Sequence, residues 1–112
     1  MSDLKMSSAE VAATRKLIGL TLSELADELG VGISAVRDWE RGRFSPREGL
    51  VRALLDLREV HDREVSRLLV AAVAGTPIHL PAGPKPKGWY LALGARVIDR
   101  FPDAILDWAE HG

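Results

Sequence analysis

The segment that most constrains the fold of this chain lies at residues 21–46, where two short helix signals are separated by a glycine. Residues 21–24, Thr-Leu-Ser-Glu, form a capping box, in which a hydroxyl accepts from a free amide of the first turn and a glutamate reaches back. Gly30 supplies the left-handed backbone that ends a helix, and a second helical pattern runs from about Ile33 to Gly42. The segment therefore predicts two short helices joined by a tight turn, the second with an arginine-rich outer face.

Helix signals continue on both sides of this pair. Residues 7–10, Ser-Ser-Ala-Glu, are another capping box and predict a helix over about 8–18, with Gly19 as its stop. Residues 45–48, Ser-Pro-Arg-Glu, predict a third box with proline at the first helical position, where its missing N–H costs nothing. Apolar residues then keep helical spacing from Leu50 to Gly75. We expect a break near His61, which we place on a helix face, because one helix of that length would lack a core on one side.

The composition changes at residues 76–88, which contain four prolines and two glycines. Proline removes amide donors and disfavours helix in the residue before it, so this stretch predicts a connector, with a short strand near residues 77–80 as an option. Residues 89–101 have the pattern of an apolar helix, and Pro102 begins a predicted last helical turn or two. The fold class is therefore mostly α, with four to five helices.

The composition also limits the class of protein. Cysteine is absent, which excludes disulfides and thiolate zinc sites. No apolar run approaches the ~20 residues that span a bilayer, and nothing after Met1 resembles a signal peptide, so we expect a cytoplasmic protein with no membrane partner. The three histidines share no ligand spacing, and there is no nucleophile–base pair or glycine-rich phosphate loop. We expect no enzymatic activity, no metal and no cofactor.

The charge distribution matters more than its sum. A net charge of −1 argues mildly against nucleic-acid binding, which usually requires a basic surface. A locally basic face is nevertheless sufficient for phosphate contacts, with modest non-specific affinity. An exposed α-helix of this kind fits the major groove of B-DNA. Between residues 37 and 52 the chain carries five arginines, Arg37, Arg41, Arg43, Arg47 and Arg52.

From Ser8 to about Leu57 the chain resembles the lambda-repressor-like (Cro/repressor, or xenobiotic-response-element) helix-turn-helix family. The resemblance lies in the run R-K-L-I-G-L-T-L-S-E-L-A-D-E-L-G-V-G-I-S-A-V-R-D-W-E-R-G-R. A finer resemblance, to the small anti-CRISPR-associated phage regulators, adds L-L-D-L-R-E-V and the late G-W-Y-L-A-L-G. The resemblance implies a DNA-binding domain over residues 1–60. It further implies a helical dimerisation segment over residues 61–112, with the Pro-rich connector at 76–88.

The family pattern also implies residue roles. An arginine of the first helix pairs with the glutamate that closes the recognition helix, here Arg15 with Glu40. Arg37 can donate two hydrogen bonds to guanine O6 and N7, and Ile33 can contact a thymine methyl. The implied base contacts are Gly32, Ile33, Ser34, Arg37 and Asp38. The implied phosphate contacts are Thr21, Arg41, Arg43 and Arg47. Two departures weaken the expected affinity, Leu22 in place of a phosphate-binding glutamine and Gly32 in place of a polar cap.

We therefore expect a sequence-specific regulator of double-stranded DNA, phage or bacterial and nucleoid-associated, acting as a repressor. One such reader recognises about half of an operator, so we expect a homodimer on an inverted repeat. An aromatic-rich set is expected to form the dimer interface: Trp89, Tyr90, Leu93, Val97, Phe101 and Trp108. The alternative is that this set folds back as core of its own monomer. In function, the alternative is an antitoxin whose C-terminal segment binds a toxin or another protein, and RNA binding ranks low.

Overall fold

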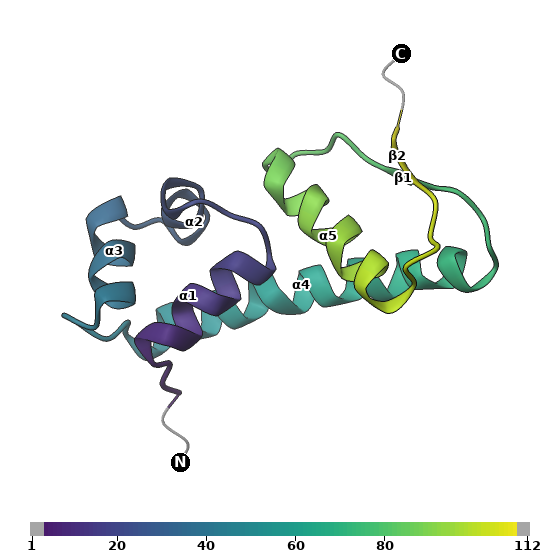
Figure 1. Ribbon diagram of the computed structural model, residues 1–112. Coiled ribbons are helices and arrows are strands. Elements are labelled where there is room, and N and C mark those ends of the chain that lie inside the picture. Colours follow the sequence, from purple (N-terminus) through teal and green to yellow (C-terminus); the bar gives the residue numbers. More distant parts are fainter. Residues whose placement is uncertain (1–3, 110–112) are drawn as a thin grey trace. The chain divides into compact units, whose positions relative to one another are not determined.

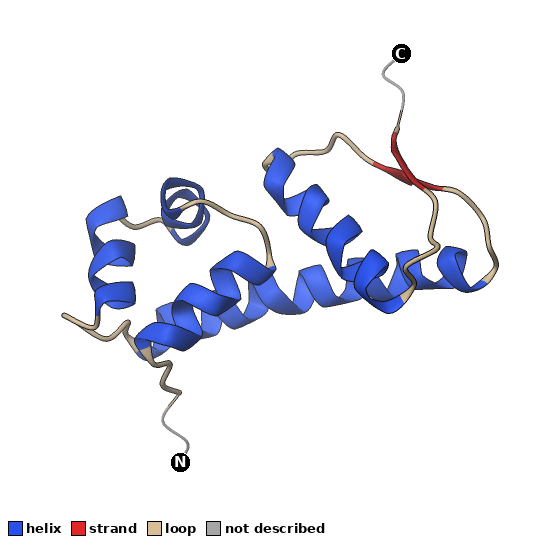
Figure 2. Cartoon of the chain, in the orientation of Figure 1, coloured by secondary structure: helices blue, strands red, loops and turns tan. Residues whose placement is uncertain are grey.

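The computed structural model describes residues 4–109, which form five α-helices and a two-stranded sheet. The mostly α class and the short strand near residues 77–80 are confirmed (Figures 1 and 2). The chain divides into two compact units, with the boundary between Glu59 and Val60 inside the fourth helix. The elements are α1 (Ser8–Leu17), α2 (Leu22–Leu29), α3 (Ile33–Arg41), α4 (Glu48–Val73), β1 (Ile78–Leu80), α5 (Lys87–Arg100) and β2 (Leu106–Trp108).

Two capping boxes begin the first two helices where the sequence predicts them. The Ser7 hydroxyl accepts from the Glu10 amide at 3.1 Å, and the Glu10 carboxylate accepts from the Ser7 amide at 2.7 Å. These bonds, that from the Ser7 amide above all, hold the pKa of Glu10 below its ordinary value. Thr21 and Glu24 repeat the arrangement at the start of α2, at 3.1 and 2.9 Å. Local hydrogen bonds alone therefore set both helix starts.

Glycines end both short helices by a left-handed turn. Gly30 closes α2 with φ 69°, and Gly42 closes α3 with φ 77°. Because a side chain at such a φ is strained, these are positions that favour glycine. The two helices and α1 then pack through a single apolar core, in which the small Ala26 is 3% exposed. The buried apolar residues of this unit are Val11, Ile18, Leu20, Leu25, Ala26, Val36, Trp39, Val51 and Leu54.

The start of α4 differs from the prediction. The expected box at residues 45–48 placed Pro46 inside the first turn, but α4 begins at Glu48. The first helical bonds run from the Leu50 and Val51 amides to the carbonyl of Arg47, at 2.9 and 3.0 Å. Pro46 therefore precedes the helix. The carbonyl of Arg47, rather than that of Ser45, accepts the first helical hydrogen bonds.

The expected break near His61 is also wrong, because α4 is continuous over 26 residues. The prediction assumed that one long helix would lack a core. In the structure the helix contributes to two cores in succession, with Val51 and Leu54 buried in the first unit and His61 and Val65 buried in the second. A helix interior without proline has no local reason to break.

The C-terminal unit contains a small parallel sheet. β1 pairs with β2 in the register Ile78 with Leu106 and Leu80 with Trp108. The predicted helical turns after Pro102 are therefore wrong. Pairing with β1 satisfies the backbone there, because the Ile78 amide bonds the Ile105 carbonyl at 2.8 Å. The core of the sheet, Ile78, Leu80 and Val97, is packed by Leu68, Leu69, Ala71, Ala72, Ala104, Leu106 and Trp108.

Helix α5 lies unusually close to this sheet at Gly94. A Cβ at that position would meet Leu80 Cδ1 at 3.1 Å and Leu106 Cδ1 at 3.2 Å. The absent side chain therefore allows α5 to approach both strands. None of the helices within residues 4–109 is long and apolar enough to cross a membrane.

Candidate nucleic-acid interface

Helix α3 presents one face to the core and leaves the other accessible. Val36 and Trp39, three residues apart, are buried, so the opposite face of α3 points away from the core. Ile33 is 39% exposed, Ser34 is exposed, and Arg37 and Asp38 are half-buried. Of the expected base-reading residues, those in the first turn of α3 are therefore exposed and those in the next turn are partly exposed. Gly32 is exposed and has no side chain, so the first-turn amides of α3 have no side-chain cap.

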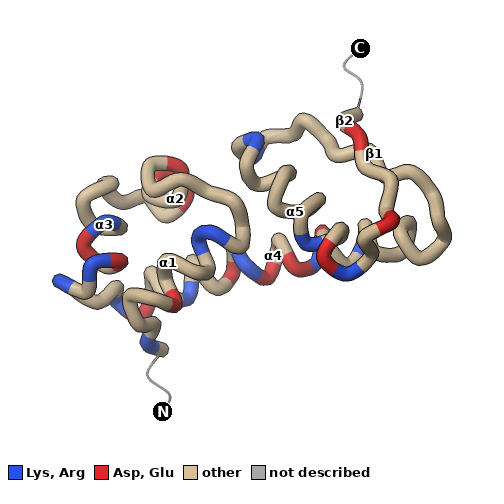
Figure 3. Tube along the Cα trace, in the orientation of Figure 1, with Lys and Arg blue, Asp and Glu red and all other residues tan. Residues whose placement is uncertain are grey.

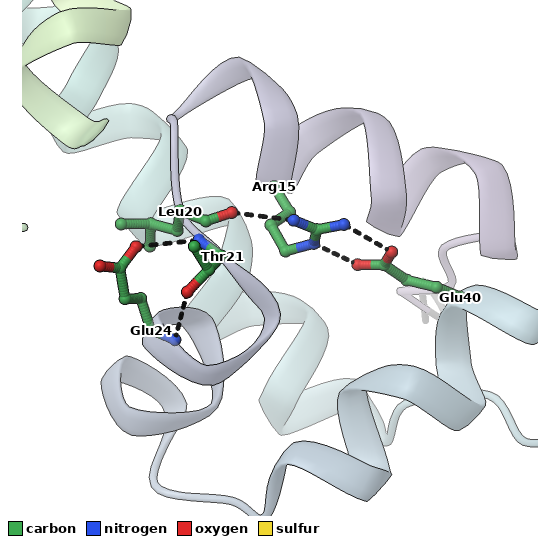
Figure 4. A network of polar contacts seen from close by, with 5 residues as sticks. All are labelled: Arg15, Leu20, Thr21, Glu24 and Glu40. Atoms are coloured by element: carbon green, nitrogen blue, oxygen red, sulfur yellow. Dashed lines mark hydrogen bonds and ion pairs between the residues drawn. The ribbon is translucent and has the colours of Figure 1, made fainter.

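The expected ion pair between Arg15 and Glu40 is present (Figure 4). Arg15 Nε donates to Glu40 Oε2 at 2.6 Å and Nη2 donates to Oε1 at 2.9 Å, a bidentate geometry. Arg15 Nη1 also donates to the carbonyl oxygen of Leu20 at 2.9 Å. The Glu40 hydrogen bond raises the pKa of Arg15, which is itself buried. One guanidinium therefore ties α1, the α1–α2 connection and the end of α3 together.

This pair is more than a loose surface contact. Exposed ion pairs contribute ~0–1 kcal/mol, because water screens them and two long side chains must be ordered. Here the side chains of Arg15 and Glu40 are 11% and 14% exposed, and three hydrogen bonds leave little freedom to reorient. The pair therefore restrains the end of α3 relative to α1.

The basic residues expected to contact phosphates lie at the exit of α3 and in the loop before α4 (Figure 3). Arg41, Arg43 and Arg47 are all exposed. Arg43 Nη1 lies 3.9 Å from Asp38 Oδ1, at the outer limit of an ion pair. A carboxylate beside phosphates repels them unless it orients a neighbouring arginine. The structure places Asp38 near Arg43, so it offsets part of the positive charge at the end of α3.

Thr21 combines capping with a free donor. Its amide and its hydroxyl oxygen are both engaged with Glu24, as described for the α2 capping box. A threonine hydroxyl that accepts one bond still has an O–H to donate. Thr21 is exposed, so a phosphate at the start of α2 could accept that bond. Leu22, next to it, is half-buried and has no polar group for this purpose.

The expected dimer interface is wrong for four of its six residues. Trp89, Tyr90, Leu93 and Val97 are buried within the C-terminal unit of a single chain, between 0% and 5% exposed. The expectation took α5 as too small to cover its aromatic side. That side is covered by the second half of α4 and by the strands, which sequence spacing did not reveal. Phe101 and Trp108 are half-buried.

The polar atoms of these aromatics also have partners inside the unit. Trp89 Nε1 donates to Glu64 Oε1 at 3.3 Å. The Tyr90 hydroxyl accepts from the Lys85 amide at 3.2 Å. Buried Trp and Tyr usually satisfy their polar groups in this way. The aromatic set is therefore the core of the C-terminal unit, which was the alternative interpretation of the sequence.

His61 is a buried residue that sequence reasoning assigned to a helix face. It is 0% exposed and its ring stands edge-on to that of Trp89, with 4.6 Å between centroids. Arg96 Nη1 lies 2.9 Å from Nδ1, and because a guanidinium only donates, Nδ1 must accept. Nε2 therefore carries the proton and donates to the Trp89 carbonyl oxygen at 3.1 Å. Burial lowers the pKa of this imidazole, which is consistent with a neutral ring.

A signal for this residue was present in the sequence. His61, Val65 and Leu68 share the i, i+4, i+7 spacing of an inward helix face, which places the histidine in an apolar row. Its role is structural, since the ring joins α4 to α5. Within residues 4–109 no three His, Asp or Glu side chains are grouped so that they could hold a metal ion.

The sequence was compared with protein families and with curated proteins. The family model described as helix-turn-helix, of the lambda-repressor type, matches residues 11–64, from α1 into α4. The match covers the Arg15–Glu40 pair, the left-handed turn at Gly30 and the whole of α3. No curated protein matches the chain.

Proposed function

Through residues 11–64 the chain belongs to the lambda-repressor-like helix-turn-helix family of DNA-binding regulators, and we propose that it is a sequence-specific repressor. In this proposal α3 enters the major groove of its operator. The observation that carries it is the outer face of α3, exposed at Ile33 and Ser34 and held in place by the Arg15–Glu40 pair. A rigidly held, accessible helix is what base readout requires.

Each base-reading residue has a chemical role. Arg37 donates to guanine O6 and N7, Ile33 contacts a thymine methyl, and Ser34 hydrogen-bonds a base edge or a phosphate. Gly32 lets the backbone approach the groove, because it has no side chain. Asp38 lies next to the phosphates and limits non-specific binding by repulsion, while its proximity to Arg43 restrains that side chain.

Phosphate contacts set the register of the helix in the groove. Arg41, Arg43 and Arg47 follow the recognition face and neutralise backbone phosphates on one side, and Thr21 donates to a phosphate on the other. Such contacts contribute affinity without sequence information. With a net charge of −1, the chain relies on few phosphate contacts, so its non-specific affinity is modest and falls less steeply with salt than that of a strongly basic DNA-binding protein.

We further propose that two copies bind an inverted repeat. A single recognition helix covers about half of an operator, and a two-fold dimer places two such helices ~34 Å apart along one side of the DNA. The antitoxin alternative expects a C-terminal segment that remains unfolded without its toxin. A buried core of its own in the C-terminal unit argues against that alternative. Its place of action would be the cytoplasm, on the nucleoid.

Selection of bound DNA from a random pool tests this function. We expect an inverted repeat from the wild-type chain. Arg37→Ala should lose preference at one symmetric base pair and weaken binding by ~1–3 kcal/mol, if Arg37 makes a bidentate contact. Arg67→Ala is the matched control, because Arg67 is an exposed arginine of α4 in the C-terminal unit. Selection of no sequence at all, or an equal loss in both variants, would contradict the proposal.

A further inference from the structure

The loop between α3 and α4 exposes an aromatic side chain. Phe44 follows the left-handed Gly42 by two residues and is 64% exposed. Within residues 4–59 the large apolar side chains that are exposed are Ile33, Phe44 and Leu55. A single exposed apolar residue is ordinary on a protein surface. Here, however, two of the three flank one helix, with Ile33 at the start of α3 and Phe44 just beyond its end.

The loop that carries Phe44 is anchored at both ends. The Arg43 amide donates to the Asp38 carbonyl oxygen at 2.9 Å, which fixes the direction in which the chain leaves α3. At the other end Pro46 is half-buried, and its ring fixes its own φ angle. The Leu50 amide then donates to the Arg47 carbonyl oxygen at 2.9 Å. A side chain held between such anchors pays a small ordering cost when it binds a partner.

The charges around Phe44 indicate the class of partner that its ring meets. Within three residues of it lie three arginines, all of them exposed (Figure 3): Arg41, Arg43 and Arg47. Of the nearest carboxylates, Glu40 is bound by Arg15, and Asp38 lies 3.9 Å from Arg43. Glu48, in the first turn of α4, is the exposed one. The surroundings of the ring are therefore positive on balance, which favours a polyanion as the partner.

The position of the loop beside α3 indicates which part of that polyanion the ring reaches. In the proposed complex the N-terminal residues of α3 contact base edges in the major groove. The chain beyond the C-terminal end of α3 then lies at the wall of the groove, which is a sugar–phosphate strand. Arginine side chains bind the phosphate oxygens of such a strand. A phenyl ring has no donor for them, but the deoxyribose between two phosphates presents carbon atoms.

From these observations we infer that the Phe44 ring packs against a deoxyribose of the operator, between phosphates that Arg43 and Arg47 bind. The inference rests on the proposed DNA-binding function and adds to it a contact that is neither a base contact nor an ion pair. Packing the ring on the sugar removes apolar surface of both from water. The contact therefore contributes affinity for every sequence without releasing counterions.

DNA titrations at several salt concentrations separate this contact from a phosphate contact. For each phosphate that a protein neutralises, log K falls with log salt by about 0.9. Phe44→Ala should weaken binding about tenfold at every salt concentration, with an unchanged slope, because apolar burial is lost and no charge is removed. Arg43→Ala is the matched control and should lower the slope by about one phosphate contact. Phe44→Leu keeps an apolar side chain and should recover most of the affinity.

Two results of these titrations would overturn the inference. An unchanged affinity of Phe44→Ala would show that the ring does not contact the DNA. A lower slope of Phe44→Ala would show that the ring only positions an arginine. Equal melting temperatures of the free wild-type and variant proteins establish that the comparison is between folded chains, as the exposure of Phe44 predicts.

Nuclear magnetic resonance tests the contact directly, because the chain contains only two phenylalanines, Phe44 and Phe101. Phe101 lies in the C-terminal unit and is the internal control. With phenylalanine-labelled protein bound to the duplex that the wild-type chain selects, the Phe44 ring protons should show nuclear Overhauser effects to deoxyribose protons. Phe101 should show none. Absence of these effects for Phe44 in the bound state would overturn the inference.

The same measurements distinguish this inference from the proposed function. If the wild-type chain selects an inverted repeat and Phe44→Ala binds it equally well, the sugar contact fails and the repressor proposal stands. If the chain binds duplexes without selecting a sequence and Phe44→Ala loses affinity at an unchanged slope, sequence-specific repression fails and the sugar contact stands. Tighter binding of single-stranded RNA than of duplex DNA, lost in Phe44→Ala, would overturn the inference, because the ring would then stack on a base.

Discussion

The two units of this molecule differ in how their structure is encoded. In the N-terminal unit a few consecutive residues set the starts of α1 and α2 and the ends of α2 and α3, as the Thr21–Glu24 box and the left-handed Gly30 do for α2. In the C-terminal unit the core joins residues far apart in the chain, because Ile78 and Leu80 of β1 meet Val97 of α5 and the second half of α4. Short-range rules describe the first unit well and the second one poorly.

Each unit also buries a charged or titratable group, and the two solve the problem differently. Arg15 keeps its charge because Glu40 compensates it with two hydrogen bonds. His61 is buried without a compensating carboxylate on its ring nitrogens and remains neutral between Arg96 and the Trp89 carbonyl. The first arrangement positions a functional helix, and the second holds a structural core together. Their responses to mutation and to pH should therefore differ.

The largest effect is expected for Trp89→Ala in the C-terminal core. Removing a fully buried tryptophan costs ~3–5 kcal/mol, which is comparable to the stability of a small unit. We expect the amide NMR signals of residues 60–109 to lose their chemical-shift dispersion, while the signals of α1, α2 and α3 keep their folded positions. Leu91→Ala, on the exposed side of α5, is the control and should leave both sets unchanged. Simultaneous loss of all signals would show that the two units fold as one.

Arg15→Ala should be the most damaging single change in the N-terminal unit that removes no apolar core residue. It leaves the Glu40 carboxylate partly buried without its partner, which costs about 3 kcal/mol. Arg41→Ala removes an exposed arginine of α3 and should stay within about 0.5 kcal/mol of wild type. Urea denaturation monitored by circular dichroism gives both values. Equal stabilities would mean that the pair does not hold α3.

Acidification should weaken the C-terminal unit selectively. The folded pKa of His61 is lowered, so the unfolded chain binds a proton that the folded chain does not. The contribution of His61 is therefore complete above its ordinary pKa of 6.5 and is lost as the pH falls below that value, by up to ~1.4 kcal/mol per pH unit. Arg96, Asp62 and Glu64 are the other charged groups that face this cluster.

His61→Gln provides the comparison for this pH effect. Glutamine can accept from Arg96 and donate to a carbonyl, but it does not titrate. The variant should show a flat unfolding free energy between pH 5.5 and 7, where the wild-type chain shows a slope. The measurement is urea denaturation across that range. Parallel slopes in the two proteins would show that another group is responsible.

The smallest effects are expected at two helical glycines, and they should have opposite signs. Gly94→Ala places a Cβ 3.1 Å from Leu80 Cδ1, so α5 or the sheet must shift at a cost of ~1 kcal/mol. Gly49→Ala in α4 meets nothing within 4 Å and should stabilise the chain by up to ~1 kcal/mol, because alanine favours helix. The melting temperatures of both variants, measured by thermal unfolding, show the sign of each effect. Stabilisation by Gly94→Ala would contradict the close approach of α5 to the sheet.

Three errors of sequence interpretation have one common cause, whereas the start of α4 is a local error in the N-terminal unit. The break expected in α4, the last helical turns and the aromatic dimer interface all concern the C-terminal unit, and each required knowledge of what lies beside a segment. Pro102 and the residues after it carry no local signal that distinguishes a helical turn from a strand paired with β1. Strand pairing over such a separation depends on tertiary neighbours rather than on local propensity.

Residue order by itself determined the starts of α1 and α2 and the turns that end α2 and α3, because capping hydrogen bonds and left-handed glycines act over a few positions. The resemblance to the helix-turn-helix family, also carried by the sequence, implied the partnership of Arg15 with Glu40. Only the tertiary structure decided that α4 is continuous, that Trp89 and its neighbours are interior, and that Leu91 and Ile98 face outward. An amphipathic pattern states which residues avoid water. It does not state whether they do so against their own chain or against a second copy, since burial of apolar surface has no direction.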